Sequence, residues 1–179
     1  MLHFHNAELL GNWLRKLKLV GLISDTHIPA RAKAIPNKVF KVFQDATLIV
    51  HAGDLTRLSI MEELEQMAPV LAVQGNMDSR DVKEKLPTLN SADIYNWRIG
   101  VTHSLGFFLR TGNLGSLIEK GFHVFISGHT HRPSIKYKEG ILFINPGSAT
   151  NPIPPFLTRP SVALLKITKK GIEPQIMNL

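Results

Sequence analysis

The chain has 179 residues, a formal net charge of +7 and no cysteine. This length accommodates one domain with a sizeable core. The lack of cysteine excludes disulfides, thiolate metal ligands and cysteine nucleophiles. Any metal must therefore be held by imidazole, carboxylate or amide oxygen, a donor set that suits Mn, Fe, Co, Ni or Zn better than soft metals.

The basic charge favours anionic partners, of which phosphate-bearing molecules are the obvious class. A well-solvated surface with a modest lysine excess explains the charge equally well. No basic stretch is interleaved with aromatic residues, so nucleic acid is expected only as a substrate. No apolar run is long enough to span a bilayer, and the first 18 residues lack a secretory pattern. We therefore expect a cytoplasmic protein without a membrane partner.

The first predicted element is an amphipathic helix over residues 7–17, weakened by Gly11. Its apolar residues fall at helical spacing: Leu10, Trp13, Leu14 and Leu17. We expect residues 1–17 to form an N-terminal helical extension and residues 18–179 to form one domain. The extension could support a homo-oligomer, cover a face of the core, or have no role.

Seven short apolar runs follow, mostly of β-branched residues or leucine and each ending at a Gly, Pro, Ser or Asp. This pattern is typical of buried strands. The runs are Leu19–Ile23, Leu48–Val50, Val70–Val73, Ile99–Thr102, Val124–Ile126, Ile141–Ile144 and Val162–Ile167.

Three helices are predicted between these strands, at Pro36–Gln44, Ser59–Met67 and Leu114–Lys120. Pro36 suits a first helical turn, Ser59 suits a cap, and Gly121 suits a helix stop. The first half of the chain thus alternates strand and helix, which favours a parallel sheet. Short turns at Tyr95–Arg98, Lys138–Gly140 and Lys169–Gly171 favour hairpins in the second half. Together they predict a mixed α/β domain of two packed sheets flanked by helices.

Potential metal ligands follow five of the predicted strands, at their carboxyl ends. In open α/β sheets this edge is where ligands bind. The residues are Asp25, His27, Asp54, Asn76, His103, His129 and His131.

This mixture of side chains suits a pair of divalent cations, because a carboxylate such as Asp54 can bridge two ions and offset their repulsion. A neutral imidazole binds one ion and keeps its second nitrogen for another partner. In D-x-H and H-x-H segments at strand exits, residues i and i+2 point the same way. Glycines before Asp54, Asn76 and His129 would allow tight turns beside a crowded site. Each motif alone is weak, but their conjunction after successive strands is a strong signal.

These motifs resemble those of the calcineurin-like metallophosphoesterase superfamily, and in particular its small, single-domain bacterial and archaeal phosphodiesterases. The resemblance covers about Lys18 to the C-terminus. It rests on Asp25-Thr26-His27, Gly53-Asp54, Gly75-Asn76, His103, Gly128-His129-Thr130-His131, Asn145-Pro146-Gly147-Ser148 and the proline-rich Asn151–Pro155. It implies a four-layer α/β/β/α sandwich of two mixed sheets.

The resemblance also implies a binuclear centre. One ion would be held by Asp25, His27 and His131, the other by Asn76, His103 and His129, and Asp54 would bridge them. The implied reaction is hydrolysis of a phosphate ester by a hydroxide that bridges the two ions, with catalytic roles for Asp54, Asn76 and His103. Mn²⁺ is our first choice, with Ni, Co, Fe or Zn as alternatives.

Met77 departs from the family pattern, since many members carry His there as the acid that protonates the leaving group. A thioether cannot donate a proton, and general acid catalysis is typically worth ~10²–10⁴-fold. We therefore expect a preference for good leaving groups. Asp78 could orient a ligand or water, or only cap a turn. Ser104, where members often have Gly, removes no ligand.

Other histidines and arginines are weaker candidates. His51 is expected to be a packed structural residue and His123 a surface residue, while His3 and His5 lie at a chain end. Three arginines near the motif loops are expected to be solvated at the surface, although each could contact a phosphate: Arg57, Arg110 and Arg132. Phe107, Phe108 and Leu109 could wall a pocket, form a subunit contact or pack in the core.

Two other classes of function are consistent with this sequence. One is a non-catalytic scaffold, because the retromer scaffold subunit has this fold with an altered metal site. The other is a basic nucleic-acid-binding protein whose metals are structural. Every implied ligand position here holds a competent residue, which favours the enzyme.

Overall fold

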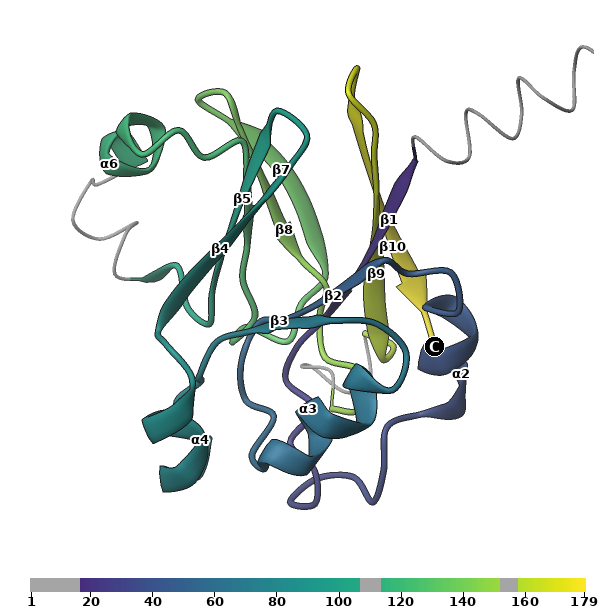
Figure 1. Cartoon of the computed structure of the whole chain (residues 1–179). Coiled ribbons are helices and arrows are strands. Elements are labelled where there is room, and N and C mark those ends of the chain that lie inside the picture. The colour runs from purple at the N-terminus through teal and green to yellow at the C-terminus, as the bar shows by residue number, and fades with distance from the viewer. Residues whose placement is uncertain (1–16, 107–113, 152–157) are drawn as a thin grey trace, which may run out of the picture.

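The computed structural model describes residues 17–106, 114–151 and 158–179. Two five-stranded sheets form its centre (Figure 1). The first has the order β10-β9-β1-β2-β3 and the second the order β4-β5-β6-β8-β7. The strands are β1 (Lys18–Ile23), β2 (Leu48–His51), β3 (Val70–Ala72), β4 (Leu89–Ile94), β5 (Trp97–Thr102), β6 (Val124–Ile126), β7 (Ser134–Lys138), β8 (Ile141–Asn145), β9 (Ser161–Ile167) and β10 (Ile172–Asn178).

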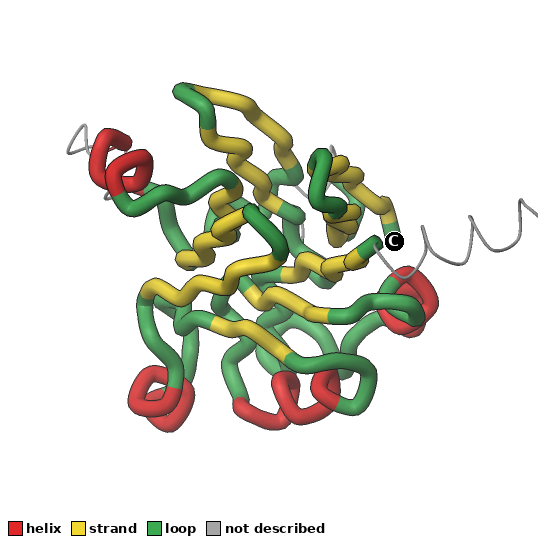
Figure 2. Tube along the Cα trace, turned by 45° about the horizontal axis from the view of Figure 1, so that its top comes forward, coloured by secondary structure: helices red, strands yellow, loops and turns green. Residues whose placement is uncertain are grey.

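Helices flank the two sheets on their outer sides. They are α2 (Asn37–Val42), α3 (Leu58–Glu65), α4 (Arg80–Lys85) and α6 (Leu114–Glu119). Figures 1 and 2 show α2 and α3 on one side of the molecule and α6 on the other. The predicted four-layer α/β/β/α sandwich of mixed sheets is therefore confirmed. No helix in the described ranges is long and apolar enough to cross a membrane.

Three apolar clusters hold the layers together, and β6 shows how one strand serves two of them. Val124 and Ile126 face the core between the sheets, whereas Phe125 packs with Leu117 of α6 on the outer side. On the first sheet, Phe43 after α2 and Leu64 of α3 lie in the third cluster. Because the central strands are covered on both faces, they appear in the sequence as continuous apolar runs.

The topology brings the carboxyl ends of the parallel strands together. Strands β1, β2 and β3 are parallel, as are β5, β6 and β8. The loops that leave β1 and β2 are joined by a hydrogen bond from the Asp25 amide to the Gly53 carbonyl (3.0 Å). The loops after β5 and β6 are joined by one from the Gly128 amide to the His103 carbonyl (3.0 Å).

All seven predicted strands are present, and the three predicted hairpins are confirmed as the antiparallel pairs β4–β5, β7–β8 and β9–β10. Two details of the helix predictions are wrong. Helix α3 begins at Leu58 after Arg57, so Ser59 is not its cap. Pro36 occupies the cap of α2, with an extended ψ of 133°, and not its first turn. Helix α4 was not predicted, because it is short and polar and buries only Val82.

Candidate metal centre

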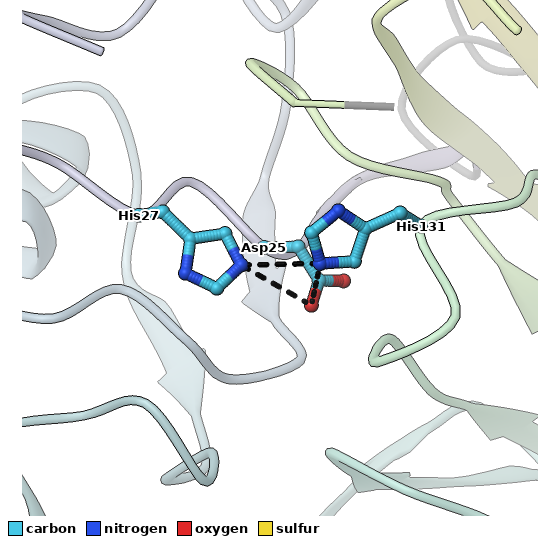
Figure 3. Close-up of side chains that lie close together, drawn as sticks. All are labelled: Asp25, His27 and His131. Carbon is cyan, nitrogen blue, oxygen red and sulfur yellow. Dashed lines mark hydrogen bonds and ion pairs between the residues drawn. The ribbon is translucent and has the colours of Figure 1, made fainter. Parts of the chain in front are cut away.

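The seven residues predicted as ligands lie at the carboxyl ends of the strands and form two adjoining groups. In the first group, His131 Nε2 lies 3.3 Å from Asp25 Oδ1 and 3.1 Å from His27 Nε2. His27 Nε2 lies 3.9 Å from the same Asp25 oxygen. Figure 3 shows both imidazoles pointing at the Asp25 carboxylate. All three residues are buried, and their donor atoms are close enough together to hold one cation.

The second group surrounds the amide oxygen of Asn76. His103 Nε2 lies 2.9 Å from Asn76 Oδ1, and His129 Nδ1 lies 3.0 Å from it. His103 is buried, whereas His129 is exposed. Two ligands that lie about 2.1 Å from one ion at right angles are about 3 Å apart. The spacing of these atoms is therefore the spacing of ligands around a first-row metal.

Asp54 lies between the two groups. Its Oδ2 atom is 3.7 Å from His27 Nε2 and 3.3 Å from His103 Nε2. Its other oxygen, Oδ1, accepts a hydrogen bond from the Met77 amide (2.7 Å). One carboxylate oxygen is thus held by the backbone, while the other faces an imidazole from each group.

The tautomer of His103 shows that this cluster fits a cation. The Nδ1 atom lies 2.8 Å from the Ala52 carbonyl, which can only accept, so Nδ1 carries the proton. The Nε2 lone pair then faces two further acceptors, Asn76 Oδ1 and Asp54 Oδ2. Three acceptors that converge repel one another unless a proton or a cation lies among them. His131 is held in a similar way: its Nδ1 contacts the Asn151 carbonyl, so its Nε2 lone pair faces the Asp25 carboxylate.

The pKa values of these residues are set by two opposing effects, burial and the contacts between imidazoles and carboxylates. Burial lowers the pKa of His103, but the hydrogen bond and charge of Asp54 outweigh it, and the pKa lies above its ordinary value. Burial also lowers the pKa of His131, but its contacts with Asp25 and with the Asn151 carbonyl outweigh burial and raise it. For His27 burial prevails over the two carboxylates and lowers the pKa. Burial raises the pKa of Asp54, yet its contact with His103 brings it below the ordinary value.

The backbone around these side chains is left-handed. Five of the seven candidate ligands have positive φ: Asp25 (52°), His27 (46°), Asp54 (57°), His129 (68°) and His131 (57°). Such a φ is uncommon outside glycine and costs roughly 1–2 kcal/mol per residue. The D-x-H and H-x-H pairs therefore converge through strained loops after the strands. The strand-like alternation expected from the sequence is not what directs them.

Glycines precede three of the candidate ligands because neighbouring atoms leave no room for a side chain. A Cβ at Gly75 would overlap Asp54, with the Asp54 Cγ at 2.8 Å and the amide nitrogen closer still. A Cβ at Gly53 would lie 2.7 Å from His103 Nδ1, and Gly53 also has a φ of +86°. The prediction that glycines border a crowded site is confirmed.

Asp78 takes a role that the sequence left open. Its carboxylate accepts hydrogen bonds from the amides of Asp54 (3.2 Å), Thr56 (2.6 Å) and Gly75 (2.6 Å). Burial raises its pKa, against the three amides, which lower it. Asp78 thereby ties the loop that carries Asp54 to the loop that carries Asn76.

The segment Asn145–Ser148 forms hydrogen bonds with the loops that carry the first group of candidate ligands. Asn145 Nδ2 donates to the Gly128 carbonyl (2.8 Å), and Ser148 Oγ donates to the Asp25 carbonyl (2.7 Å). Ser24 Oγ donates to the Gly147 carbonyl (2.6 Å). The sequence identified this segment only through the family resemblance, because no ligand lies within it.

Residues outside the cluster mostly follow the predictions. His51 is buried and contacts Thr26 Oγ1 through Nε2 (3.2 Å), and burial lowers its pKa to about 4. His123 is exposed, as are Arg57 and Arg132. Met77 is 56% exposed beside Asn76. Several predictions fall outside the described residues: His3, His5, the helix up to residue 16, Phe107, Phe108, Leu109, Arg110 and the prolines at 152–155.

Comparison with known proteins identifies the class to which this fold and cluster belong. The family profile of the calcineurin-like phosphoesterase superfamily domain matches residues 19–170. A probable metallophosphoesterase of Methanothermobacter thermautotrophicus is 45% identical over 163 residues, covering 89% of this chain and 91% of the relative. The chain therefore belongs to the calcineurin-like phosphoesterase superfamily, as the resemblance implied.

Solved structures agree on the fold. A Thermotoga maritima protein is 31% identical with a TM-score of 0.69, covering 90% of this chain and 99% of that one. Vacuolar protein sorting 29 of Cryptosporidium parvum has a TM-score of 0.73 at 23% identity, covering 91% and 99%. The fold is thus shared by this chain, by the Thermotoga maritima protein and by a protein named for vacuolar sorting.

Proposed function

We propose that this protein is a divalent-metal-dependent phosphodiesterase with a binuclear centre. The observation that supports it best is the position of Asp54 Oδ2, between His27 (3.7 Å) and His103 (3.3 Å). A single carboxylate oxygen that faces an imidazole from each group is suited to bridge two ions. A lone structural metal would need no such second group.

In this proposal Asp25, His27 and His131 hold one ion, Asn76, His103 and His129 hold the other, and Asp54 bridges them. The candidate ligands offer only nitrogen and oxygen atoms, a donor set that favours Mn²⁺, with Ni, Co, Fe or Zn as alternatives. When bound, such ions supply positive charge at the phosphoryl oxygens and a source of hydroxide at neutral pH.

The chain's own residues prepare the site for an anionic substrate. The net charge of +7 attracts phosphate esters to the protein. The Nδ1–H groups of His103 and His131 are held by backbone carbonyls, so both rings keep one orientation. Met77 offers no proton to a leaving group, which favours esters whose leaving group departs as an anion.

Hydrolysis by metal-stripped protein tests the proposal. Bis-p-nitrophenyl phosphate and p-nitrophenyl phosphate are offered with Mn²⁺, Ni²⁺, Co²⁺ or Zn²⁺. We expect turnover only with added metal and faster turnover of the diester. Asp54→Asn should lower kcat/KM by ~10²–10³-fold, and the exposed Asp93→Asn should leave it unchanged. Retained activity in Asp54→Asn would exclude Asp54 as the ligand that bridges the two ions.

The alternative function is a non-catalytic scaffold of the same fold. It predicts no turnover of any ester with any of these metals, together with an intact fold. The competent side chain at each of the seven positions supports the enzyme over this alternative.

A further inference from the structure

A shallow pocket of about 420 Å³ opens beside the second group of candidate ligands, against Asn76, His103 and His129. The rest of its wall comes from the loop after β3, from α4, from Thr88 before β4, and from the end of β5 and the loop that follows it. The side chains there are polar or cationic: Gln74, Lys83, Thr88, Thr102 and Ser104. No carboxylate lines the pocket within the described residues. Among the described residues, Lys83 carries the one permanent charge in this wall, so the lining suits an anionic group better than a cationic one.

Lys83 is held at the rim of this pocket by two interactions. Gln74 Nε2 donates to the carbonyls of Lys83 (3.0 Å) and Leu86 (2.6 Å), which fastens the end of α4 to the loop after β3. Lys83 Nζ in turn donates to the Asn76 carbonyl (2.9 Å). The ammonium group therefore contacts the backbone of Asn76, the residue whose side chain is a candidate ligand.

The charge of Lys83 is not neutralised by the protein. In the part of the chain that the structure describes, Lys83 forms no ion pair, although its helix carries the pair Arg80–Glu84. Its hydrogen bond to a neutral carbonyl uses one of three ammonium protons. Ser104 Oγ accepts the Gly106 amide (3.3 Å) and keeps its own proton for donation. The pocket thus offers a cation and a hydroxyl to a ligand.

We propose that this pocket binds a second anionic group of the substrate, with Lys83 as its cationic contact. The inference rests on the proposed function, because the metal centre takes the phosphate that is cleaved. It narrows the substrate class to phosphodiesters that carry a further phosphate a short distance away. A nucleotide 5′-phosphodiester that also carries a 3′-phosphate has this chemistry, and a nucleoside 3′,5′-bisphosphate is the corresponding product.

Binding to the Mn²⁺-loaded full chain gives a readout that does not need turnover. Calorimetry compares thymidine 3′,5′-bisphosphate with thymidine 5′-monophosphate. We expect the wild type to bind the bisphosphate about 10-fold more tightly, a typical gain for one charge-assisted hydrogen bond. Lys83→Gln should reduce this ratio to about 2-fold, while Lys83→Arg should keep it. Lys85→Gln removes the same charge from the same helix outside the pocket and should also keep it.

Two outcomes would overturn the proposal. One is an unchanged ratio in Lys83→Gln. The other is an equal loss of affinity for both nucleotides, which would mean that Lys83 only supports the Asn76 loop. Mn²⁺ binding by Lys83→Gln, measured in the same way, separates loss of the metal from loss of the anion contact.

Hydrolysis distinguishes failure of this inference from failure of the proposed function. The substrates are thymidine 5′-(p-nitrophenyl phosphate) with and without a 3′-phosphate. Equal kcat/KM for both, in wild type and Lys83→Gln, would reject the pocket and leave the enzyme intact. No turnover of either, with the binding ratio retained, would reject the enzyme and leave the anion pocket intact.

Discussion

The carboxylate of Asp78 accepts a hydrogen bond from the backbone amide of Asp54 at 3.2 Å. Asp78, which is not one of the candidate ligands, thereby positions Asp54, which lies between the two candidate metal groups. The same carboxylate also accepts the amides of Thr56 and Gly75. Its three donors come from two loops that follow different strands. One buried side chain therefore helps to fix the position of Asp54 relative to Asn76, together with the hydrogen bond from the Met77 amide to Asp54 Oδ1.

Asp78→Asn should weaken both the fold and the metal site. An amide offers one oxygen and turns an NH₂ group toward backbone donors, so at least one buried amide loses its partner. We expect a loss of about 1–3 kcal/mol in the free energy of unfolding and weaker Mn²⁺ binding, measured by denaturant titration and calorimetry. Asp93→Asn is the exposed control. Wild-type stability in Asp78→Asn would show that these three contacts contribute nothing.

Gly75→Ala should abolish metal binding, because the new methyl group would overlap the Asp54 carboxylate and amide. Gly171→Ala is a matched control, since a Cβ there meets nothing within 4 Å. Equilibrium dialysis with Mn²⁺ compares the two variants. Normal Mn²⁺ binding by Gly75→Ala would mean that the loop after β3 can move away from Asp54 without disturbing the cluster.

Divalent metal should stabilise the fold, because a cation removes the repulsion among the acceptors around His103 Nε2. At a metal concentration 100 times its dissociation constant, the free energy of unfolding should rise by about 2.7 kcal/mol. A chelator should reverse the rise in melting temperature. Asp54→Asn should show a much smaller rise. A melting temperature that does not respond to any of the four metals would contradict the cluster's assignment as a metal site.

Met77→His should restore a proton donor beside Asn76, at a side chain that is 56% exposed. General acid catalysis matters most when the leaving group is poor. We expect about a 10-fold or greater increase in kcat for an alkyl phosphodiester and less than about 3-fold for bis-p-nitrophenyl phosphate. An equal effect on both esters would refute the argument that this chain lacks an acid.

His51 should make stability depend on pH. Its pKa is about 4 in the folded state and 6.5 ordinarily, so the unfolded chain takes up a proton first as the pH falls. Its contribution is complete above pH 6.5 and is lost as the pH falls towards 4, by up to about 3 kcal/mol. Urea titrations of metal-stripped wild type and His51→Gln at several pH values measure it. If the free energy of unfolding changed with pH equally in the two proteins between pH 6.5 and 4, the predicted role of His51 would be contradicted.

Much of this structure could be predicted from the sequence, because local patterns carry the relevant physics. Strands such as Leu48–His51, buried on both faces, need continuous apolar runs, and turns such as Glu139–Gly140 need residues that accept positive φ. The outer strands of the predicted hairpins were not assigned to residues in the sequence, because their patterns are weak. Edge strand β7 is mostly exposed, and β10 contains Pro174, which a sheet edge tolerates.

The sequence by itself determined which side chains could hold a metal, since their types and their positions after strands are local properties. Only the tertiary structure decided how they meet: the left-handed turns at Asp25 and His131, the three amides on Asp78, and Lys83 beside Asn76. These features depend on contacts between segments far apart in the chain. A strained backbone or a shared hydrogen bond exists only once packing has brought those segments together.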